Sequence, residues 1–306
     1  MIVIKVKNKG LKVLSLFGGI ETGLLALQEL GIPIEEYHTY EILPAAIKVS
    51  KKNFPFIIHH GDVRNADFSQ YKGFDLVLGG SPCQNRSRIR IETPEIHNGL
   101  QGNKSSLFLE YARAIEIIKP KWFLLENVVS DIPEDDDTIT KTLGVDPILI
   151  NSNLFSAQDR ERLYWTNIPI DELPKSCSIV IKNIMDADVP EKYYYNKDYI
   201  FNGEDKKIIA TLKINTTEMC RRVYNPNFKC GTLTCITGGY QEKKVWDNGR
   251  IRKFTEQEYE KLQQLPVGFT DGCGLSYTAR CSLCGNGWSK DVIKFILKGI
   301  KYKKGN

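Results

Sequence analysis

Hydrophobic positions along the first half of the chain follow two periods in alternation. Short, almost unbroken apolar runs such as LKVLSLF predict strands that are covered on both faces. Between them, segments such as ETGLLALQELG carry leucines at helical spacing before a glycine, which predicts helices. Strands that alternate with helices over about 150 residues predict βαβ units. We therefore expect an α/β fold with a doubly wound, mostly parallel sheet.

The expected elements follow the apolar runs along the chain. The amino terminus, MIVIKVKNKGLKVLSLF, alternates apolar residues with lysines and predicts strand. Further strands are expected at EEYHTYE, FIIHHGDV, FDLVLGG and WFLLENV, with two more at DPILIN and RLYWTNI. Helices are expected at LPAAIKVSKKNF and SLFLEYARAIEIIKP.

The periodicity weakens in the second half of the chain. Strand-like pieces (SIVIKNIM, KKIIATLKI and CGTLTCI) lie among aromatic and basic clusters, which predicts a smaller mixed lobe over residues 171–250. FTEQEYEKLQQLP predicts a helix, because Thr255 and Glu258 have the spacing of a capping box. SKDVIKFILKGI predicts a terminal amphipathic helix. We expect residues 1–170 to form the main domain.

Composition adds a charge asymmetry to this organisation. Residues 1–170 carry 19 Lys or Arg and 21 Asp or Glu, whereas residues 171–306 carry 23 and 16, a net charge of +7. A basic second half modestly favours a polyanionic partner. The apolar runs are too short to cross a bilayer and no signal peptide precedes them, so we expect no membrane partner. Eight cysteines in 306 residues are too sparse for a disulfide scaffold and favour a reducing, cytoplasmic location.

Polar or glycine-rich groups follow five of the expected strands. In a parallel sheet, ligands bind outside the carboxyl ends of the strands. The groups at these ends are Phe17-Gly18-Gly19, Glu41, Asp62, Cys83 and Glu126-Asn127. Their recurrence at successive strand ends predicts a site at that edge of the sheet.

The glycine turn and two acids predict a nucleoside cofactor. The glycines of FGGIETG let the backbone approach a ligand at a helix amino terminus, but their spacing is not the GxGxxG of nicotinamide enzymes. Roughly 20 residues on, Glu41 is placed to bind ribose hydroxyl groups, and Asp62 follows at the next strand end, where it can accept from an adenine amino group. Either acid alone is more simply a helix cap or a solvated loop residue. Together with the turn, they favour a cofactor without a pyrophosphate.

Cys83 is the candidate nucleophile. It follows Pro82 beyond the strand FDLVLGG and precedes NRSRIR, which holds three arginines. A thiolate near basic groups is a good nucleophile, although a single cysteine at a strand end is more often a packed side chain. The segment Gln84–Ser105 is polar and contains Gly99 and Gly102, so we expect a mobile loop that closes over a substrate.

Glu126 and the segment QDRER favour the interpretation of Cys83 as a nucleophile over that of a packed side chain. Glu126 ends an otherwise apolar strand, where a carboxyl group can protonate or hydrogen-bond a base ring. Gln158, Arg160 and Arg162 would share one face of an extended segment and present positive charge beside Glu126. A solvated charged strand edge explains that segment equally well on its own.

Ten motifs occur in order along almost the whole chain. They are LSLFGGIETGL, YEILPAA, GDV, GGSPCQNRS, KSSLFLEYARAI, FLLENV, QDRERLYW, CGTLTCITGG, FTEQEYEKLQQLPVGF and GNGWSKDVI. In this order they resemble the cytosine-C5 DNA methyltransferase family, which uses S-adenosylmethionine. The first half is most similar to the catalytic domains of animal de novo members. The resemblance implies a Rossmann-like catalytic and cofactor-binding domain at residues 1–170, a small target-recognition region at 171–250, and C-terminal helices at 251–306 that return to the catalytic domain.

The resemblance also implies a role for each matching residue of the expected site. Cys83 would attack C6 of a flipped-out cytosine, and Glu126 would contact N3 and the exocyclic amine. Arg162 would lie at O2 of the cytosine near Glu126, and Arg160 would support the site or the DNA backbone. Attack at C6 would activate C5 toward the methyl group of S-adenosylmethionine, with S-adenosylhomocysteine as the product. The base must leave the stack because C6 is inaccessible there.

Cofactor contacts implied by the resemblance come from both ends of the chain. They map to Phe17, Gly19, Ile20, Glu41, Asp62, Val63, Pro82, Leu107, Asn286 and Trp288. The turn contains GGIETG where many bacterial members carry GGIGG, a departure that we expect to be tolerated. The recognition region, residues 175–230, is short. Cys281 and Cys284 form a CxxC within a cofactor-side motif, so we expect no metal site.

Methylation of double-stranded DNA is the leading hypothesis, and others stay open. A tRNA cytosine-C5 methyltransferase would use the same catalytic motifs, and a catalytically inactive DNA-binding relative would bind without turnover. The presence of both Cys83 and Glu126 disfavours the inactive relative, and the glycine spacing disfavours a nicotinamide oxidoreductase. The target sequence (CpG is a weak guess) and the oligomeric state are undetermined. So is a pairing with a cognate restriction endonuclease in a bacterial or phage-infected cell, where the enzyme would associate with the nucleoid.

Overall fold

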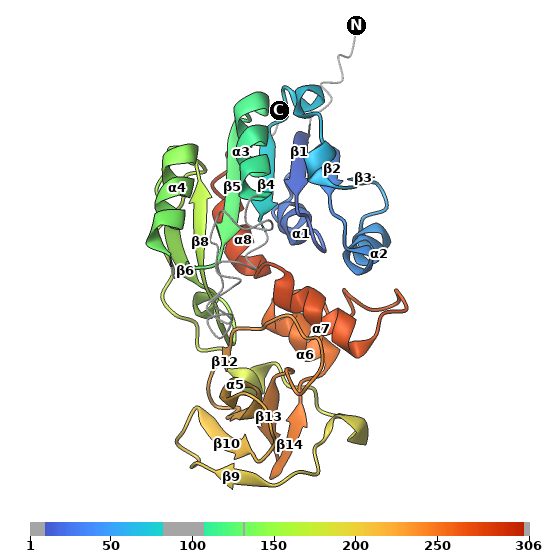
Figure 1. The fold of residues 1–306 in the computed structure, drawn as a ribbon, viewed down its shortest axis with the longest axis vertical. Helices are drawn as coiled ribbons and strands as arrows, with labels where there is room; N and C mark the ends of the chain where they lie inside the picture. The colour runs from blue at the N-terminus through green and yellow to red at the C-terminus, as the bar shows by residue number, and fades with distance from the viewer. Residues whose placement is uncertain (1–9, 82–106, 131, 303–306) are drawn as a thin grey trace, which may run out of the picture. The chain divides into compact units, whose positions relative to one another are not determined.

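The computed structural model describes residues 10–81, 107–130 and 132–302. The chain forms two compact units, which are described separately (Figure 1). Unit 1 comprises residues 1–150, 161–172 and 293–306, and unit 2 comprises residues 151–160 and 173–292. These limits differ from the regions expected from the sequence, and the functional roles expected for those regions stay predictions.

A seven-stranded sheet forms the centre of unit 1, with strand order β3-β2-β1-β4-β5-β8-β6. Strands β1 to β5 run parallel to one another, and β8 runs antiparallel to β5. The expected doubly wound, mostly parallel sheet is therefore confirmed. Within the described residues, the predicted amino-terminal strand begins at Leu11; residues 1–9 lie outside them. The strands are β1 (Leu11–Leu16), β2 (Ile34–Tyr40), β3 (Ile58–His60), β4 (Leu76–Gly80), β5 (Trp122–Asn127), β6 (Ile148–Asn151) and β8 (Glu161–Thr166).

Among its described residues, unit 1 contains four complete helices and part of a fifth. They are α1 (Thr22–Glu29), α2 (Pro44–Asn53), α3 (Leu107–Ile118), α4 (Pro133–Leu143) and the second half of α8 (Lys290–Leu297), together with the 3-10 turns η1 (Val63–Asn65) and η2 (Phe68–Tyr71). Apolar periodicity does not predict α4, because PEDDDTITKTL is mainly polar. Its boundary signals are Pro133 at the start and Gly144 just beyond the end. Among the described helices, none is long and apolar enough to cross a bilayer.

Both faces of the sheet in unit 1 are buried. On one face, Leu14 of β1 and Val77 of β4 share a core cluster with Phe108 and Tyr111 of α3, and Figure 1 shows α3 lying across β4 and β5. The strand residues that alternate with these, such as Val13, are also fully buried. A parallel sheet covered in this way explains why its strands form continuous apolar runs in the sequence.

Unit 2 contains a five-stranded mixed sheet, with strand order β14-β13-β11-β10-β9, and a two-stranded pair, β12-β7. KKIIATLKI forms β10 as predicted. The strands are β7 (Gln158–Asp159), β9 (Tyr199–Phe201), β10 (Ile208–Leu212), β11 (Arg222–Tyr224), β12 (Cys230–Gly231), β13 (Lys244–Asp247) and β14 (Arg250–Lys253). The helices are α5 (Glu218–Arg221), α6 (Glu256–Leu262), α7 (Tyr277–Asn286) and the start of α8, with 3-10 turns η6 (Ser152–Leu154), η7 (Ile181–Asn183) and η8 (Glu191–Tyr193).

Two segments predicted as strands in this lobe were predicted wrongly. SIVIKNIM contains only the turn η7, and the amide of Ile181 donates to the carbonyl of Phe228, 3.0 Å away. CGTLTCI is strand only at its first two residues. Beyond them, the amide of Leu233 donates to Gln158 Oε1 at 2.8 Å instead of to a neighbouring strand. In both cases the backbone amide donates to a residue distant in sequence and not to the carbonyl of a neighbouring strand.

The predicted capping box of α6 is confirmed. Thr255 Oγ1 accepts from the amide of Glu258 at 3.1 Å, and Glu258 Oε2 accepts from the amide of Thr255 at 2.7 Å. The same Glu258 carboxylate binds the guanidinium of Arg252 through two bonds of 2.7 and 2.8 Å. This connection ties α6 to β14, and residues 251–292 belong to unit 2.

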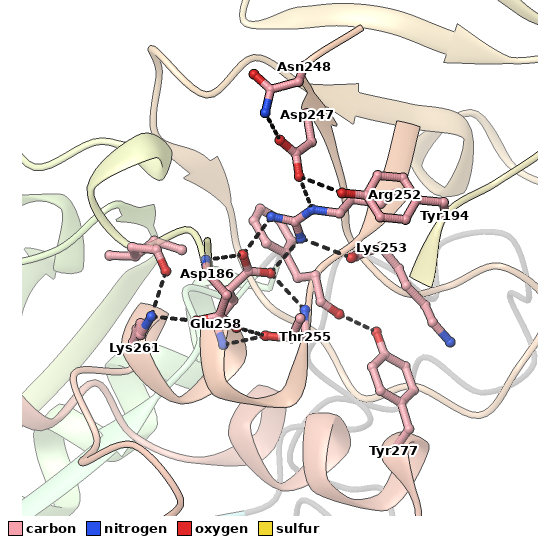
Figure 2. A network of polar contacts seen from close by, with 12 residues as sticks. Asp186, Tyr194, Asp247, Asn248, Arg252, Lys253, Thr255, Glu258, Lys261 and Tyr277 are labelled. Carbon is pink, nitrogen blue, oxygen red and sulfur yellow. Dashed lines mark hydrogen bonds and ion pairs between the residues drawn. The ribbon is translucent and has the colours of Figure 1, made fainter. Parts of the chain in front are cut away.

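The Arg252 guanidinium lies at the centre of a buried polar network (Figure 2). Its side chain is fully buried, and its Nε donates to Asp247 Oδ2 at 2.6 Å. Glu258 also accepts from the amide of Asp186, whose carboxylate binds Lys261 at 2.6 Å. A planar guanidinium that forms bidentate bonds is suited to such a buried pair. Each buried charge in the network therefore has an opposite charge and hydrogen bonds.

Replacing Arg252 by methionine should strongly destabilise the protein. Glu258 would remain buried without its counter-charge, which typically costs about 3–5 kcal/mol. Urea unfolding measures the change in the free energy of unfolding. Arg250→Met is the matched control, because Arg250 lies on the same strand and pairs with the exposed Glu191; it should change stability far less. Equal losses in the two variants would contradict the prediction.

Candidate functional site

The turn between β1 and α1 is a tight, left-handed structure. Phe17, Gly19 and Glu21 have φ angles of 58°, 57° and 61°. The amide of Glu21 donates to the carbonyl of Gly18 at 2.9 Å, and that of Gly18 donates to the carbonyl of Tyr40 at 3.3 Å. Left-handed φ angles are costly for residues other than glycine. The side chains around the turn must therefore stabilise it.

The Glu21 carboxyl group provides much of this stabilisation from below the turn. It is 1% exposed and accepts from Tyr37 Oη at 2.7 Å and from Thr39 Oγ1 at 2.5 Å. A Cβ at Gly18 would lie 2.0 Å from Glu21 Oε1, so only glycine fits above the carboxyl group. Burial raises the pKa of Glu21 to about 7, against the lowering effect of hydrogen bonds from Thr39, Tyr37 and Ser15.

Glu41 joins the end of β2 to the same turn. Its Oε2 accepts from the amide of Gly19 at 2.8 Å, and its Oε1 accepts from the amides of Ile42 and Leu43 at 2.8 and 2.7 Å. Ile42 is 66% exposed, an unusual position for a large apolar side chain beside a carboxylate. The sequence analysis missed Ile42 and Leu43; an apolar pair directly after a strand-end acid is the signal that would find them.

Asp62, at the end of β3, is paired with Arg64. Asp62 caps η1 by accepting from the amide of Arg64 at 3.0 Å, and its carboxylate binds the Arg64 guanidinium. Arg64 lowers the pKa of Asp62 through these bonds. Because the Arg64 side chain is largely exposed, it can move aside for a ligand. A Cβ at Gly61 or Gly19 would meet no atom within 4 Å, so there is open space beside both residues.

The other residues expected to contact the cofactor differ in how exposed they are. Ile20 and Val63 are buried at 2% and 4% exposure, so a cofactor would meet their backbone. Phe17 and Leu107 are partly buried against the core cluster. Two further positions, Asn286 and Trp288, are in unit 2, where Asn286 ends α7 with an exposed side chain.

Ser81 directly follows β4 and lies two residues before Cys83 in the sequence. Asn127 Nδ2, at the end of β5, donates to Ser81 Oγ at 2.9 Å. Gly79 leaves room for the Tyr111 ring of α3, because a Cβ there would lie 2.5 Å from it. Pro82, Cys83 and the expected loop Gln84–Ser105 lie outside the described residues. The roles of Asn127 and Ser81 as anchors were not expected from the sequence.

Glu126 and Arg162 form an ion pair on neighbouring strands. Arg162 Nε lies 3.0 Å from Glu126 Oε1, and each side chain is less than 15% exposed, at 14% for Arg162 and 11% for Glu126. Glu126 is paired with Gly80 of β4 on one side and with Tyr164 of β8 on the other. Of the expected catalytic residues, the structure brings together these two, beside the strand that leads to Cys83.

Gln158, Arg160 and Arg162 do not share one face, contrary to our expectation. Gln158 belongs to β7, which pairs with β12, whereas Arg162 belongs to β8, which pairs with β5. Arg160, between them, is 4% exposed and donates to three backbone carbonyls, those of Leu233, Gly285 and Gly287, at 3.0–3.1 Å. In this conformation its guanidinium binds unit 2 itself, which leaves the expected contact with a DNA backbone without support.

A family model for the C-5 cytosine-specific DNA methylase matches residues 11–302. The chain belongs to this family. The expectation drawn from the ordered motifs is therefore confirmed.

Curated relatives of this chain include two enzymes that are much longer than the aligned region. The orphan methyltransferase M.SPRI of Bacillus phage SPR is 32% identical over 173 residues, or 53% of this chain and 38% of the relative. The type II methyltransferase M.NgoBV of Neisseria gonorrhoeae is 29% identical over 205 residues, or 59% of this chain and 47% of the relative. The aligned region thus spans less than half the length of these two relatives. M1.ScrFI of Lactococcus lactis subsp. cremoris is 27% identical over 86% of this chain and 71% of its own.

Solved methyltransferase structures share the fold of this chain. The Entamoeba histolytica methyltransferase EhMeth superposes with a TM-score of 0.72 at 18% identity, over 95% of this chain and 98% of that one. S. pombe Dnmt2 superposes with a TM-score of 0.67 at 16% identity, over 94% and 97% of the two chains. At these identities the likeness concerns the fold alone.

Replacing Gly18 by alanine should distort the turn. The new Cβ would lie 2.0 Å from Glu21 Oε1 and 2.3 Å from Thr39 Oγ1, so the carboxyl group would have to leave its position. Overpacking of this kind typically costs about 1–3 kcal/mol. Thermal unfolding tests this against Gly61→Ala, which adds a Cβ in open space. The prediction is wrong if the two variants have the same melting temperature.

The burial of Glu21 should make stability fall as pH rises toward neutral. Because its folded pKa of about 7 exceeds the ordinary value of 4.5, the folded state holds a proton that the unfolded chain releases. Its stabilising contribution is complete below pH 4.5 and is lost as pH passes 7, a change on the order of 3 kcal/mol. Urea unfolding at pH 5 and pH 8 measures it. Glu21→Gln should remove this component; parallel pH profiles for the two proteins would contradict the assignment.

Proposed function

We propose that the chain methylates C5 of a flipped-out cytosine in double-stranded DNA, through a covalent bond between Cys83 and C6. The observation that carries the proposal is the largely buried Glu126–Arg162 ion pair beside β4, the strand that leads to Cys83. Membership of the C-5 cytosine-specific DNA methylase family supports the reaction class. The further steps follow from the chemistry of the ring.

Cytosine C5 is a poor nucleophile until C6 is attacked. The Cys83 thiolate forms a bond to C6 while Glu126 donates a hydrogen bond or proton at N3, so electron density moves to C5. Bound S-adenosylmethionine supplies an electrophilic methyl group on its sulfonium. After methyl transfer, loss of the C5 proton restores the ring double bond and releases the thiolate. Ser81, held by Asn127, keeps the chain before Cys83 in place.

The Glu126–Arg162 pair is suited to hold the ring. Arg162 holds the Glu126 carboxyl group at the carboxyl end of β5. The guanidinium N–H groups of Arg162 that remain free can donate to O2 of the base. Strands β5 and β8 hold both side chains, because Glu126 and Tyr164 are paired across the two strands. Arg160 stabilises unit 2 itself, through the carbonyls of Leu233, Gly285 and Gly287.

The residues at the carboxyl ends of β1, β2 and β3 fit S-adenosylmethionine. Open space beside Gly19 and Gly61 admits a ligand. The Glu41 carboxylate is held by the backbone and keeps lone pairs for ribose hydroxyl groups. Exposed Ile42 offers an apolar surface to an adenine ring. Binding across this edge agrees with the topological switch point between β1 and β4, where ligands of doubly wound sheets bind.

A nucleic acid is the class of substrate that the charge distribution favours, and we propose double-stranded DNA within that class. The net charge of +7 on residues 171–306 supports contact with a phosphate backbone. Flipping the base costs a few kcal/mol, which these contacts would offset. A tRNA substrate would use the same catalytic residues and is the alternative outcome of the experiment below.

Transfer of labelled methyl groups to duplex DNA and to tRNA tests the proposal. We expect transfer to DNA, and Cys83→Ser should reduce it by at least about a thousandfold because the nucleophile is lost. Glu126→Gln should reduce it by about 10²–10⁴, the usual contribution of general acid catalysis. Cys235→Ser, at an exposed cysteine, is the control and should retain activity. Transfer to tRNA alone, or full activity in Cys83→Ser, would overturn the proposal.

A further inference from the structure

The Glu21 carboxyl group is buried without a positively charged partner. Its hydrogen-bond partners are the hydroxyl groups of Tyr37 and Thr39, with Ser15 contributing a third. Within the part of the chain that the structure describes, no basic side chain forms an ion pair with Glu21. Buried carboxylates elsewhere in the chain are treated differently, since Glu258 has Arg252 at 2.7 Å. An ionised Glu21 thus has hydrogen bonds but no counter-charge.

The carboxyl group lies in direct contact with the turn that we assign to the cofactor. Glu21 Oε1 is 2.0 Å from where a Gly18 Cβ would be. Gly18 lies between Phe17 and Gly19, two of the proposed cofactor contacts, and open space lies beside Gly19. A positive charge on a ligand at this turn would therefore be close to Glu21, with little water between them to screen the interaction.

The methyl donor and its product differ by one positive charge near the reacting atom. S-adenosylmethionine has a sulfonium, whereas S-adenosylhomocysteine has a neutral thioether. A buried carboxylate without a protein counter-ion interacts favourably with the first and gains nothing from the second. Because specificity is a difference of affinities, the charge of the buried carboxylate changes the ratio of the affinities for S-adenosylmethionine and S-adenosylhomocysteine.

We propose that Glu21 is a specificity-determining residue, the buried counter-charge that makes this site favour the charged methyl donor over the neutral product. The inference rests on the proposed use of S-adenosylmethionine. It gives the carboxyl group a role beyond supporting the turn, since loss of the methyl group would also weaken the hold on the product and help its release.

The discrimination should depend on pH. Tyr37 and Glu41 are the titratable groups that face Glu21; burial raises the pKa of Tyr37 well above its ordinary value, so its hydroxyl stays protonated. Glu21 itself has a pKa of about 7. Below that pH Glu21 is protonated and neutral, and it does not strengthen binding of the donor relative to the product. Above that pH it is ionised, and binding of the donor favours the ionised form further.

Calorimetric titration with S-adenosylmethionine and S-adenosylhomocysteine tests the proposal. The ratio of the two affinities should rise between pH 6 and pH 8 by about tenfold for each pKa unit by which the donor lowers the pKa of Glu21. In Glu21→Gln the ratio should stay near its value at pH 6 in the unsubstituted protein. The amino group of the donor also titrates near pH 8, at about 7.7–8.0 for an α-amino group, but equally in both proteins.

Proton release provides a second readout that needs no variant. At pH 6, binding of the donor should release more protons than binding of the product, measured as the dependence of the binding enthalpy on the buffer. Glu116→Gln, which removes an exposed carboxylate from α3, is the matched control and should behave as the unsubstituted protein. This readout keeps the proposal testable if Glu21→Gln does not fold.

The outcomes separate this inference from the proposed function. A ratio that does not change with pH, or that changes equally in Glu21→Gln, together with equal proton release for the two ligands, would overturn the role of Glu21 and leave the methyltransferase proposal standing. Failure of both ligands to bind at any pH would instead count against the use of S-adenosylmethionine itself.

Discussion

The parallel register of β1, β2, β4 and β5 is the constraint on which the site depends. Residue-by-residue pairing of these strands brings their carboxyl ends to one edge of the sheet. It places Gly80 beside Glu126 and lets Asn127 reach Ser81, two residues before Cys83. A slip of one residue would turn each side chain to the opposite face of the sheet. The apolar strands, buried on both faces, resist that slip.

Three buried carboxyl groups illustrate how the chain compensates negative charge. Glu258 is fully buried and bound by the Arg252 guanidinium, which makes it part of a structural network. Glu126 is slightly more exposed and lies 3.0 Å from Arg162 Nε, while Nη1 of Arg162 donates to the carbonyl of Glu161 at 2.7 Å. Glu21 accepts hydrogen bonds from the hydroxyl groups of Tyr37 and Thr39 and has no ion pair among the described residues, which is the basis of the role proposed for it.

Local patterns predicted the parts of the fold that depend on neighbouring residues. The alternation of strands and helices in unit 1 and the Thr255–Glu258 capping box were predicted correctly, because apolar period and capping act within a few residues. SIVIKNIM and CGTLTCI were predicted wrongly, because partners such as Phe228 and Gln158 are distant in sequence. Apolar, β-branched segments of this kind have strand propensity whether or not a neighbouring strand is available.

By itself the sequence determined the parallel α/β sheet and the family to which the chain belongs. These follow from local periodicity and from the order of motifs along the chain. Tertiary structure alone decided that Arg160 and Arg162, two residues apart, bind different partners. It also decided that Glu21 is buried beneath Gly18 against Tyr37 and Thr39. Burial and charge compensation depend on which distant residues meet in space, and that information is not contained in the spacing of residues along the chain.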